Sequence, residues 1–210
     1  MTPLLTLTQW LSPGFPTGAF AYSHGLEQVI HDGVVTDAPS LELWLADVLR
    51  YGAGWQDAVL LVQALNPGAD LDALDATARA LQPGAERLQE TLEQGAAFAR
   101  TVAAVSGRNL PARALPVAVG EAAAPLGLPP EQVVALFVQG FTANLVTIAV
   151  RHVPLGQTAG QGVLARLAPI IADIATRTAR STLDALAGST LAADLAAIRH
   201  ETKDVRLFRT

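Results

Sequence analysis

Apolar residues recur along most of the chain with the spacing of helices that turn one face towards a core. In residues 41–49, leucines together with Trp44 and Val48 occupy positions i, i+3, i+4, i+7 and i+8, and residues 164–175 repeat this pattern. No segment shows the sustained two-residue alternation that is typical of half-buried β-strands. The pattern predicts an all-α fold.

Helix stop signals divide the chain into segments. Glycine or Asn-Pro-Gly follows three expected helices, namely residues 20–31 before Gly33, 40–65 before Asn66-Pro67-Gly68, and 85–106 before Gly107. Another helix is expected over residues 163–187. In total we expect roughly nine helices with short connections. Because neither a solenoid-length repeat nor a low-complexity linker is present, residues 1–210 are predicted to form a single-domain helical bundle.

Residues 132–150 contain no charged side chain and have nearly the length of a membrane span. Polar groups such as Gln139, Thr142 and Asn144 are scattered around this segment, and no Lys/Arg-rich flank accompanies it. We therefore predict a central helix enclosed by other helices, and no interaction with a membrane.

Composition excludes several classes of function. Alanine and leucine, with 39 and 31 residues, favour packed helices, and the formal net charge of −5 disfavours binding to nucleic acid. The absence of cysteine removes thiolate ligands and nucleophiles and fits a reducing compartment. Lys203 is the only lysine, so we expect no Walker-type hydrolysis of ATP or GTP. The first ten residues lack the features of a secretory signal, and we expect a cytoplasmic protein.

Residues 12–27, SPGFPTGAFAYSHGLE, form a segment whose prolines and glycines fix a non-helical entry to the next helix. Within it, residues 21–25 match the A-x-S-x-G variant of a hydrolase nucleophile elbow, with Ser23 as the nucleophile. That elbow requires a strand leading into the serine, whereas the residues before Ser23 form a proline-broken loop. The alternative is a structural serine that bonds to a neighbouring carbonyl.

The same segment resembles the urease accessory protein UreF family. The family pattern S-P-x-x-P-x-G-x-F-x-Y-S-x-G-L-E is present at all its fixed positions from Ser12 to Glu27. Ten fixed positions within sixteen make this a specific motif.

Residues 154–162, PLGQTAGQG, lie between two expected helices. Gln157 and Gln161 would either line a polar path or cap the following helix. The loop resembles the L-G-Q-T-D-G-Q sequence that is common in UreF proteins. Ala159 occupies the acidic position, so a role of that acid in the family does not carry over to this chain.

Residues 200–210, HETKDVRLFRT, which we call the tail, combine charged residues with the apolar pair Leu207-Phe208. Arg and Phe are enriched at interface centres, and chain termini are usually mobile, so a flexible tail that binds a partner is one interpretation. The other is that Phe208 folds back onto its own bundle. UreF chains typically end in H-E-x-x-x-x-R-L-F-R-S, and this tail matches with Thr210 in place of the serine. The candidate partner-binding residues in the tail are His200, Glu201, Arg206, Leu207, Phe208 and Arg209.

The resemblance implies an all-α bundle that forms a homodimer and joins a UreD-type scaffold, called UreH in some species, and the GTPase UreG. In the family this assembly docks on apo-urease so that nickel reaches the active site. We therefore expect a non-enzymatic adaptor that activates, restrains or positions the GTPase. Four residues, Tyr22, Ser23, Gly25 and Glu27, are expected to belong to an interaction surface, and the tail is expected to bind the scaffold.

The histidines do not predict a nickel site within this chain. His24 and His31 are seven residues apart, or about 10 Å along one helix, which is too far for a shared ion without other ligands. His200 is followed by Glu201 but lacks a second histidine four residues on. We expect no cofactor in this chain, and we expect the complex to handle nickel.

Two other functions remain open. A hydrolase that uses Ser23 would turn over esters, and a free-standing helical interaction protein would not depend on a GTPase partner.

Overall fold

The computed structural model describes residues 2–210, which form ten α-helices, three short 3-10 helices and no β-strand. The all-α prediction is therefore confirmed. The α-helices are α1 (Thr2–Trp10), α2 (Leu26–His31), α3 (Ala38–Tyr51), α4 (Ala53–Leu65), α5 (Leu71–Ala80), α6 (Ala85–Ser106), α7 (Leu115–Ala123), α8 (Pro130–His152), α9 (Gln157–Thr178) and α10 (Leu191–His200). The 3-10 helices are Ala19–Ala21, Ala124–Leu126 and Leu183–Ala185.

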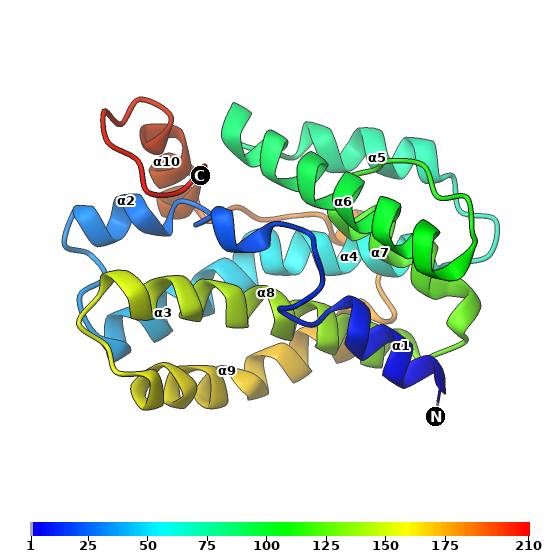
Figure 1. The fold of residues 1–210 in the computed structure, drawn as a ribbon, viewed down its shortest axis with the longest axis horizontal. Helices are drawn as coiled ribbons and strands as arrows, with labels where there is room; N and C mark the ends of the chain where they lie inside the picture. Colours follow the sequence, from blue (N-terminus) through cyan, green and yellow to red (C-terminus); the bar gives the residue numbers. More distant parts are fainter. Residues whose placement is uncertain (1) are drawn as a thin grey trace.

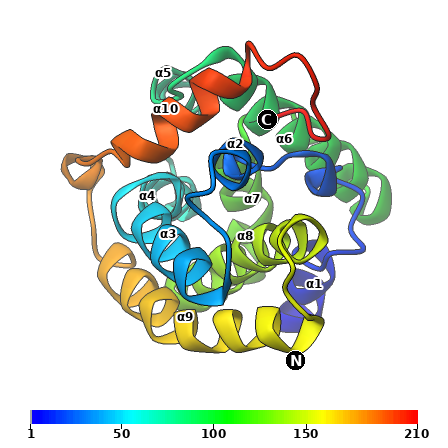
Figure 2. The ribbon, with the colours of Figure 1, turned by 90° about the vertical axis from the view of Figure 1, so that its left-hand side faces the viewer.

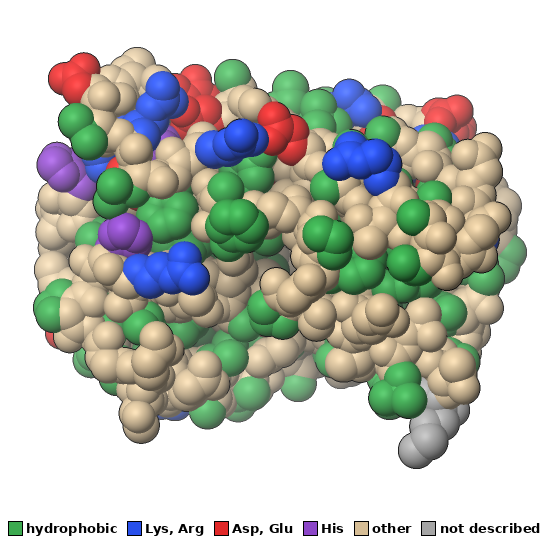
Figure 3. All heavy atoms as spheres, in the orientation of Figure 1, with side chains coloured by type: hydrophobic (Ala, Val, Ile, Leu, Met, Phe, Trp, Pro, Cys, Tyr) green, Lys and Arg blue, Asp and Glu red, His purple; other side chains and the backbone are tan. Residues whose placement is uncertain are grey.

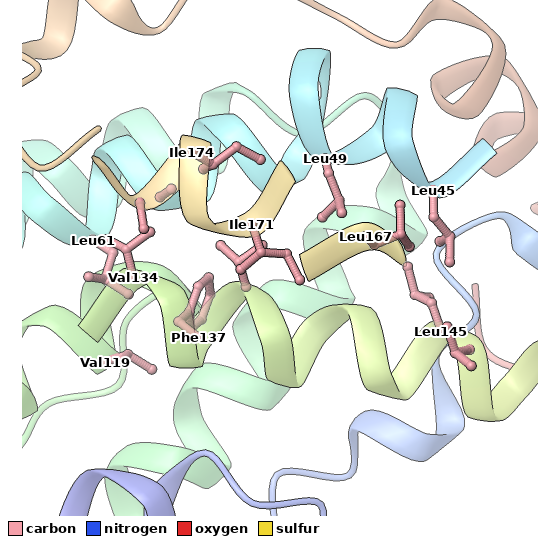
Figure 4. Packing of buried hydrophobic residues seen from close by; sticks show 14 of the residues in the cluster. Leu45, Leu49, Leu61, Val119, Val134, Phe137, Leu145, Leu167, Ile171 and Ile174 are labelled. Carbon is pink, nitrogen blue, oxygen red and sulfur yellow. The ribbon is translucent and has the colours of Figure 1, made fainter. Parts of the chain in front are cut away.

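Helix α8 runs through the middle of the bundle. It packs most extensively against α9 and also contacts α4, α2 and α3, which lie around it in Figures 1 and 2. Buried aliphatic side chains of α3, α4 and α9 meet Val134, Phe137 and Leu145 of α8 in this interior (Figure 4). The removal of these side chains from water is the main force that holds the bundle together.

Helices α6, α7 and α10 build the part of the molecule that carries the tail. Helix α7 packs against both α4 and α6, while α10 contacts α2 and α6. The chain leaves α10 at the upper edge of the molecule and turns back towards α2, so its end lies between α2 and α6 (Figure 1).

The single helix predicted for residues 40–65 is in fact two helices. The break falls at Gly52, where the backbone has φ −111° and ψ −138°. Just beyond it, α4 passes so close to α3 that a Cβ at Gly54 would lie 2.7 Å from the Cα of Leu49. The apolar spacing continues across the break, so periodicity alone does not reveal it.

Helix α9 begins and ends earlier than the predicted range 163–187, because it spans Gln157–Thr178. The residues beyond it form a loop that is tied to α4. There the indole N–H of Trp55 donates a 2.7 Å hydrogen bond to the carbonyl of Ala185. This tertiary bond holds the loop in a path that a continued helix would not follow.

The helix predicted over residues 20–31 is also interrupted. A 3-10 turn and an extended Tyr22 lead to two residues with left-handed backbone, His24 at φ 59° and Gly25 at φ 77°, before α2 begins. His24 therefore lies outside the helix that carries His31. The expected separation of two turns along one helix is wrong for this pair.

Helix α8 is long and apolar enough to span a membrane, and it alone passes this test among residues 2–210. Half of its most apolar stretch is buried inside the bundle, against the helices named above. This is the packing expected of a core helix, as the scattered polar residues predicted.

Candidate functional site

The tail lies folded back over α2 and the first half of α6 (Figures 1 and 2). Its last residues run beside the extended Tyr22 and exchange main-chain hydrogen bonds with the residues on either side of it. The N–H of Arg209 donates to the carbonyl of Ala21 (2.8 Å), and the N–H of Ser23 donates to the carbonyl of Thr210 (3.1 Å). Of the two interpretations of the sequence, the structure therefore shows the folded-back one.

Glu27 is the carboxylate on which the tail converges. It is 7% exposed and accepts hydrogen bonds from Nε2 of His200 (3.1 Å), from Nζ of Lys203 (3.0 Å) and from the main-chain N–H groups of Leu207 and Phe208 (3.1 and 2.9 Å). Burial acts to raise the pKa of Glu27, but these hydrogen bonds outweigh it and lower the pKa to about 2. Glu27 is thus ionised at neutral pH and fixes the path of the tail.

Three glutamates of α6, at spacings of four and three residues, form a second row of anchors. Glu86 pairs with Arg206, Glu90 accepts a hydrogen bond from the hydroxyl of Thr210 (3.0 Å), and Glu93 pairs with Arg209 (2.6 Å). The motifs of the sequence do not include these glutamates. Acidic residues at i, i+4 and i+7 share one helix face. This spacing, together with the arginines of the tail, is the sequence signal that could have predicted that the tail binds this face.

His200 links the two rows. Its buried ring places Nδ1 2.7 Å from a carboxylate oxygen of Glu86 and Nε2 3.1 Å from one of Glu27. Each ring nitrogen thus faces a carboxylate of a different row. The neighbouring Glu201 accepts a 3.1 Å hydrogen bond from the main-chain N–H of Glu86, which satisfies one of the free N–H groups at the start of α6.

Ser23 is a buried structural hydroxyl. It donates to the carbonyl of Thr210 and accepts a 3.1 Å hydrogen bond from the N–H of Glu27, and its side chain has no exposed surface. Within residues 2–210 no strand leads into it. This arrangement does not match the exposed nucleophile elbow considered above.

Tyr22 also contacts the tail. Its hydroxyl donates to Glu93 and accepts a 3.3 Å hydrogen bond from Arg209, whose guanidinium lies 5.9 Å from the centre of the ring. Burial and the hydrogen bond to Glu93 raise the pKa of Tyr22. The tyrosine therefore stays neutral, as is required for donation to a carboxylate.

Gly25 is required where α2 meets α10. Its φ of 77° lies in the left-handed region, and a Cβ there would lie 3.0 Å from the main-chain nitrogen of Ala197. Because α10 leads directly into the tail, this close approach sets the position from which the tail starts.

The tail turns apolar side chains outward. Leu207 is 67% exposed and Val205 is 73% exposed, although the N–H of Leu207 is bound to Glu27. Phe208 instead is half-buried, with its ring centre 4.9 Å from that of His152. Basic and acidic side chains alternate along this upper edge of the molecule, whereas the lower part of the same face shows few charges (Figure 3).

Gln157 and Gln161 do not join this cluster. Both are exposed in the first turns of α9, and the N-terminus of that helix has no side-chain cap. The prediction that they contact a partner stays a prediction.

Three of the four histidines face different side chains. His24 faces Glu90 (3.4 Å), His152 faces Phe208, and both nitrogens of His200 face glutamates. Within residues 2–210 no three His, Cys, Asp or Glu side chains come together as a metal site would require. The expectation that nickel is handled by a complex stays a prediction.

Replacing Ser23 by alanine separates the structural from the catalytic interpretation. We expect Ser23→Ala to lower the free energy of unfolding by about 1–3 kcal/mol, because it leaves the Glu27 N–H without its buried acceptor and removes one of the two hydrogen bonds to the Thr210 carbonyl. Urea unfolding measures this change, with Ser106→Ala as an exposed-serine control. Hydrolysis of p-nitrophenyl acetate by the wild type that disappears in Ser23→Ala would instead establish a nucleophile.

The comparisons with known proteins identify the family. The UreF profile matches residues 35–168. The chain is 62% identical over 207 residues to the "Urease accessory protein UreF" of Cereibacter sphaeroides (strain ATCC 17029 / ATH 2.4.9), an alignment that covers 99% of this chain and 98% of the relative. The proteins of the same name from Paracoccus denitrificans and Roseobacter denitrificans are 52% and 50% identical, with 98% of this chain and 95% and 93% of those chains covered. Unlike the profile match, these alignments leave at most a few residues of the chain uncovered, so the likeness includes the region of the site. The chain belongs to the UreF family of urease accessory proteins.

Proposed function

We propose that this protein is a non-enzymatic adaptor in urease maturation. It joins a UreD/UreH-type scaffold and the GTPase UreG, modulates the GTPase, and takes part in the delivery of nickel to apo-urease. It acts in the cytoplasm as a homodimer, without nucleic acid, a membrane or a cofactor of its own. Membership of the family supports the proposal, and so does the formal net charge of −5, which suits protein partners better than phosphate backbones.

The exposed side chain of Leu207 on a fixed main chain is the observation that supports a partner-binding tail. Its N–H is bound to Glu27, so the residue is held in place, yet two thirds of its surface remains open to solvent. A pre-positioned apolar side chain loses little entropy on binding. Arg206 and Arg209 flank it, with their guanidinium groups partly exposed beside Glu86 and Glu93.

We expect Leu207→Ala to weaken binding to the UreD/UreH-type scaffold by about 1–3 kcal/mol, the loss typical of an anchor residue at an interface. The fold should not change, because the side chain is exposed and the main-chain N–H is retained. Titration calorimetry with the purified scaffold measures the affinity, and a thermal melt of the free variant checks the fold.

Leu43→Ala is the matched control, since Leu43 lies on α3 and is 70% exposed. Equal affinity of Leu207→Ala and the wild type would remove Leu207 from the interface. Co-purification with the scaffold and UreG, followed by light scattering, tests the adaptor itself. A defined two-fold complex supports it, and failure of the wild-type chain to bind either partner would contradict it.

A further inference from the structure

A cavity of about 490 Å³ lies between the loop of residues 12–20, α6 and α8. Its volume is within the range of small-molecule sites. Exposed Phe20, Thr147 and Arg151 stand at its mouth. Its wall is rich in aromatic rings, contributed by Trp10, Phe15, Phe20, Phe98, Phe137 and Phe141. The partner-binding surface proposed above does not use this cavity.

Charged side chains form the polar part of the cavity wall. Glu90 pairs with Arg87 and is also contacted by His24 (3.4 Å) and by the amide of Gln94 (3.3 Å). Among residues 2–210, Asp57 of α4 has no hydrogen bond and no ion pair from its side chain, although it lines the same cavity. Among residues 2–210, the carboxylate of Asp57 and the exposed guanidinium of Arg151 at the mouth are thus the charged groups of this wall without a protein partner.

In the inner wall Arg87 and Glu90 form an ion pair, in which Asp57 takes no part. Arg87 is neutralised by Glu90, and the pKa of His24 is lowered by burial and by Arg87, so its ring stays uncharged at neutral pH. An ionised Asp57 then adds a negative charge that Arg87, which is already paired with Glu90, offsets only in part. Burial raises the pKa of Asp57 to about 7, with Arg87 lowering it and Glu90 raising it. Burial and Glu90 thus outweigh the effect of Arg87, the cation that acts on Asp57.

We propose that this cavity binds a small organic cation, an ammonium or guanidinium group carried on an apolar or aromatic body. The cationic head would pair with Asp57 and supply its missing hydrogen-bond donors. The aromatic rings would surround the body, and their faces attract cations as well. A divalent metal ion fits less well, because no three metal-binding side chains meet within residues 2–210 and most of the wall is apolar.

Titration calorimetry with 2-phenylethylammonium chloride tests the proposal, with 2-phenylethanol as the uncharged probe of the same shape. At pH 8 we expect the wild type to bind the ammonium at least tenfold more tightly than the alcohol. Asp57→Asn should lose at least tenfold in affinity for the ammonium and bind the alcohol unchanged. Asp47→Asn, which alters an exposed aspartate of α3, should behave as the wild type does.

The pH dependence of wild-type binding gives a second readout that needs no variant. The other charged or titratable groups of the wall are Arg87 and Glu90 on α6, Arg151 on α8, and His24, which precedes α2. With the pKa of His24 below 6.5 and that of Glu90 at about 2, Asp57 is the group that titrates near pH 7. Affinity for the ammonium should rise about tenfold from pH 6 to pH 8, as the ionised fraction of Asp57 rises. Absence of binding at millimolar concentration, equal binding of ammonium and alcohol, or a flat pH profile would each overturn the proposal.

Discussion

Replacing Glu27 by glutamine is expected to lower the free energy of unfolding by about 3–5 kcal/mol, the usual cost of breaking a buried ion pair from one side. The amide keeps the shape of the side chain but leaves the buried His200 and Lys203 facing a neutral group. It also accepts more weakly from the N–H groups of Leu207 and Phe208. The tail should therefore loosen before the bundle unfolds.

Two measurements separate these effects. Urea unfolding gives the loss of stability, and amide hydrogen exchange of residues 204–210 reports release of the tail. Glu42→Gln is the matched control, because Glu42 forms an exposed pair with Arg166 and should cost at most about 1 kcal/mol. A Glu27→Gln variant that melts as the wild type does, with the tail still protected, would show that Glu27 does not hold the tail.

Acid is expected to destabilise the protein strongly between pH 5 and pH 2. Burial raises the pKa of Glu90, but Arg87 and His24 outweigh this effect and lower the pKa to about 2. The hydrogen bonds from the tail likewise lower the pKa of Glu27 to about 2. Both pKa values lie below the unfolded value of 4.5, so the stabilisation is present above pH 5 and is lost as the pH falls through the folded pKa. Each glutamate should account for roughly 3 kcal/mol of this loss.

Asp57 has the opposite effect on the pH dependence of stability. Its folded pKa of about 7 lies above the model-peptide value of 3.8, so the stability that it contributes is complete below pH 4 and is lost as the pH rises through 7. Together the three groups place the stability maximum near pH 5. Urea unfolding from pH 2.5 to pH 8, at fixed protein concentration, measures the profile. In Glu27→Gln the free energy of unfolding should depend less on pH below pH 5, and in Asp57→Asn it should depend less on pH between pH 5 and pH 8. A wild-type free energy of unfolding that does not change from pH 5 to pH 2.5 would contradict the assignment.

The contacts of the tail differ in the protection that they have from solvent. Those of Glu27 and Glu90 are buried, whereas the pair of Arg209 with Glu93 is exposed. Exposed pairs contribute little and weaken with salt, while buried pairs are costly to break. The inner contacts therefore hold the tail, and the outer arginine can exchange its partner without loss of the fold.

The sequence by itself determined those features that depend on neighbouring residues. Residues 85–106 form the predicted helix, and Gly107 ends it with φ 72°, because capping and helical periodicity act within a few residues. The motif of residues 12–27 likewise identified the family without coordinates, since it needs only residue types in order. The motifs at both ends of the chain also singled out Glu27 and the tail, which the structure brings together, while their binding of a partner stays a prediction.

Only the tertiary structure decided which of these residues meet, and why. Glu27 and Phe208 are separated by 181 positions, and Glu86 and Arg206 by 120, so no local pattern links them. The interruptions at Gly52 and around His24 also involve distant residues. A Cβ at Gly52 would collide with the hydroxyl of Thr190, and the tail binds the backbone groups of Ala21 and Ser23. A helix propensity of a few tenths of a kcal/mol per residue yields to such contacts, because each buried hydrogen bond or clash is worth about 1 kcal/mol or more.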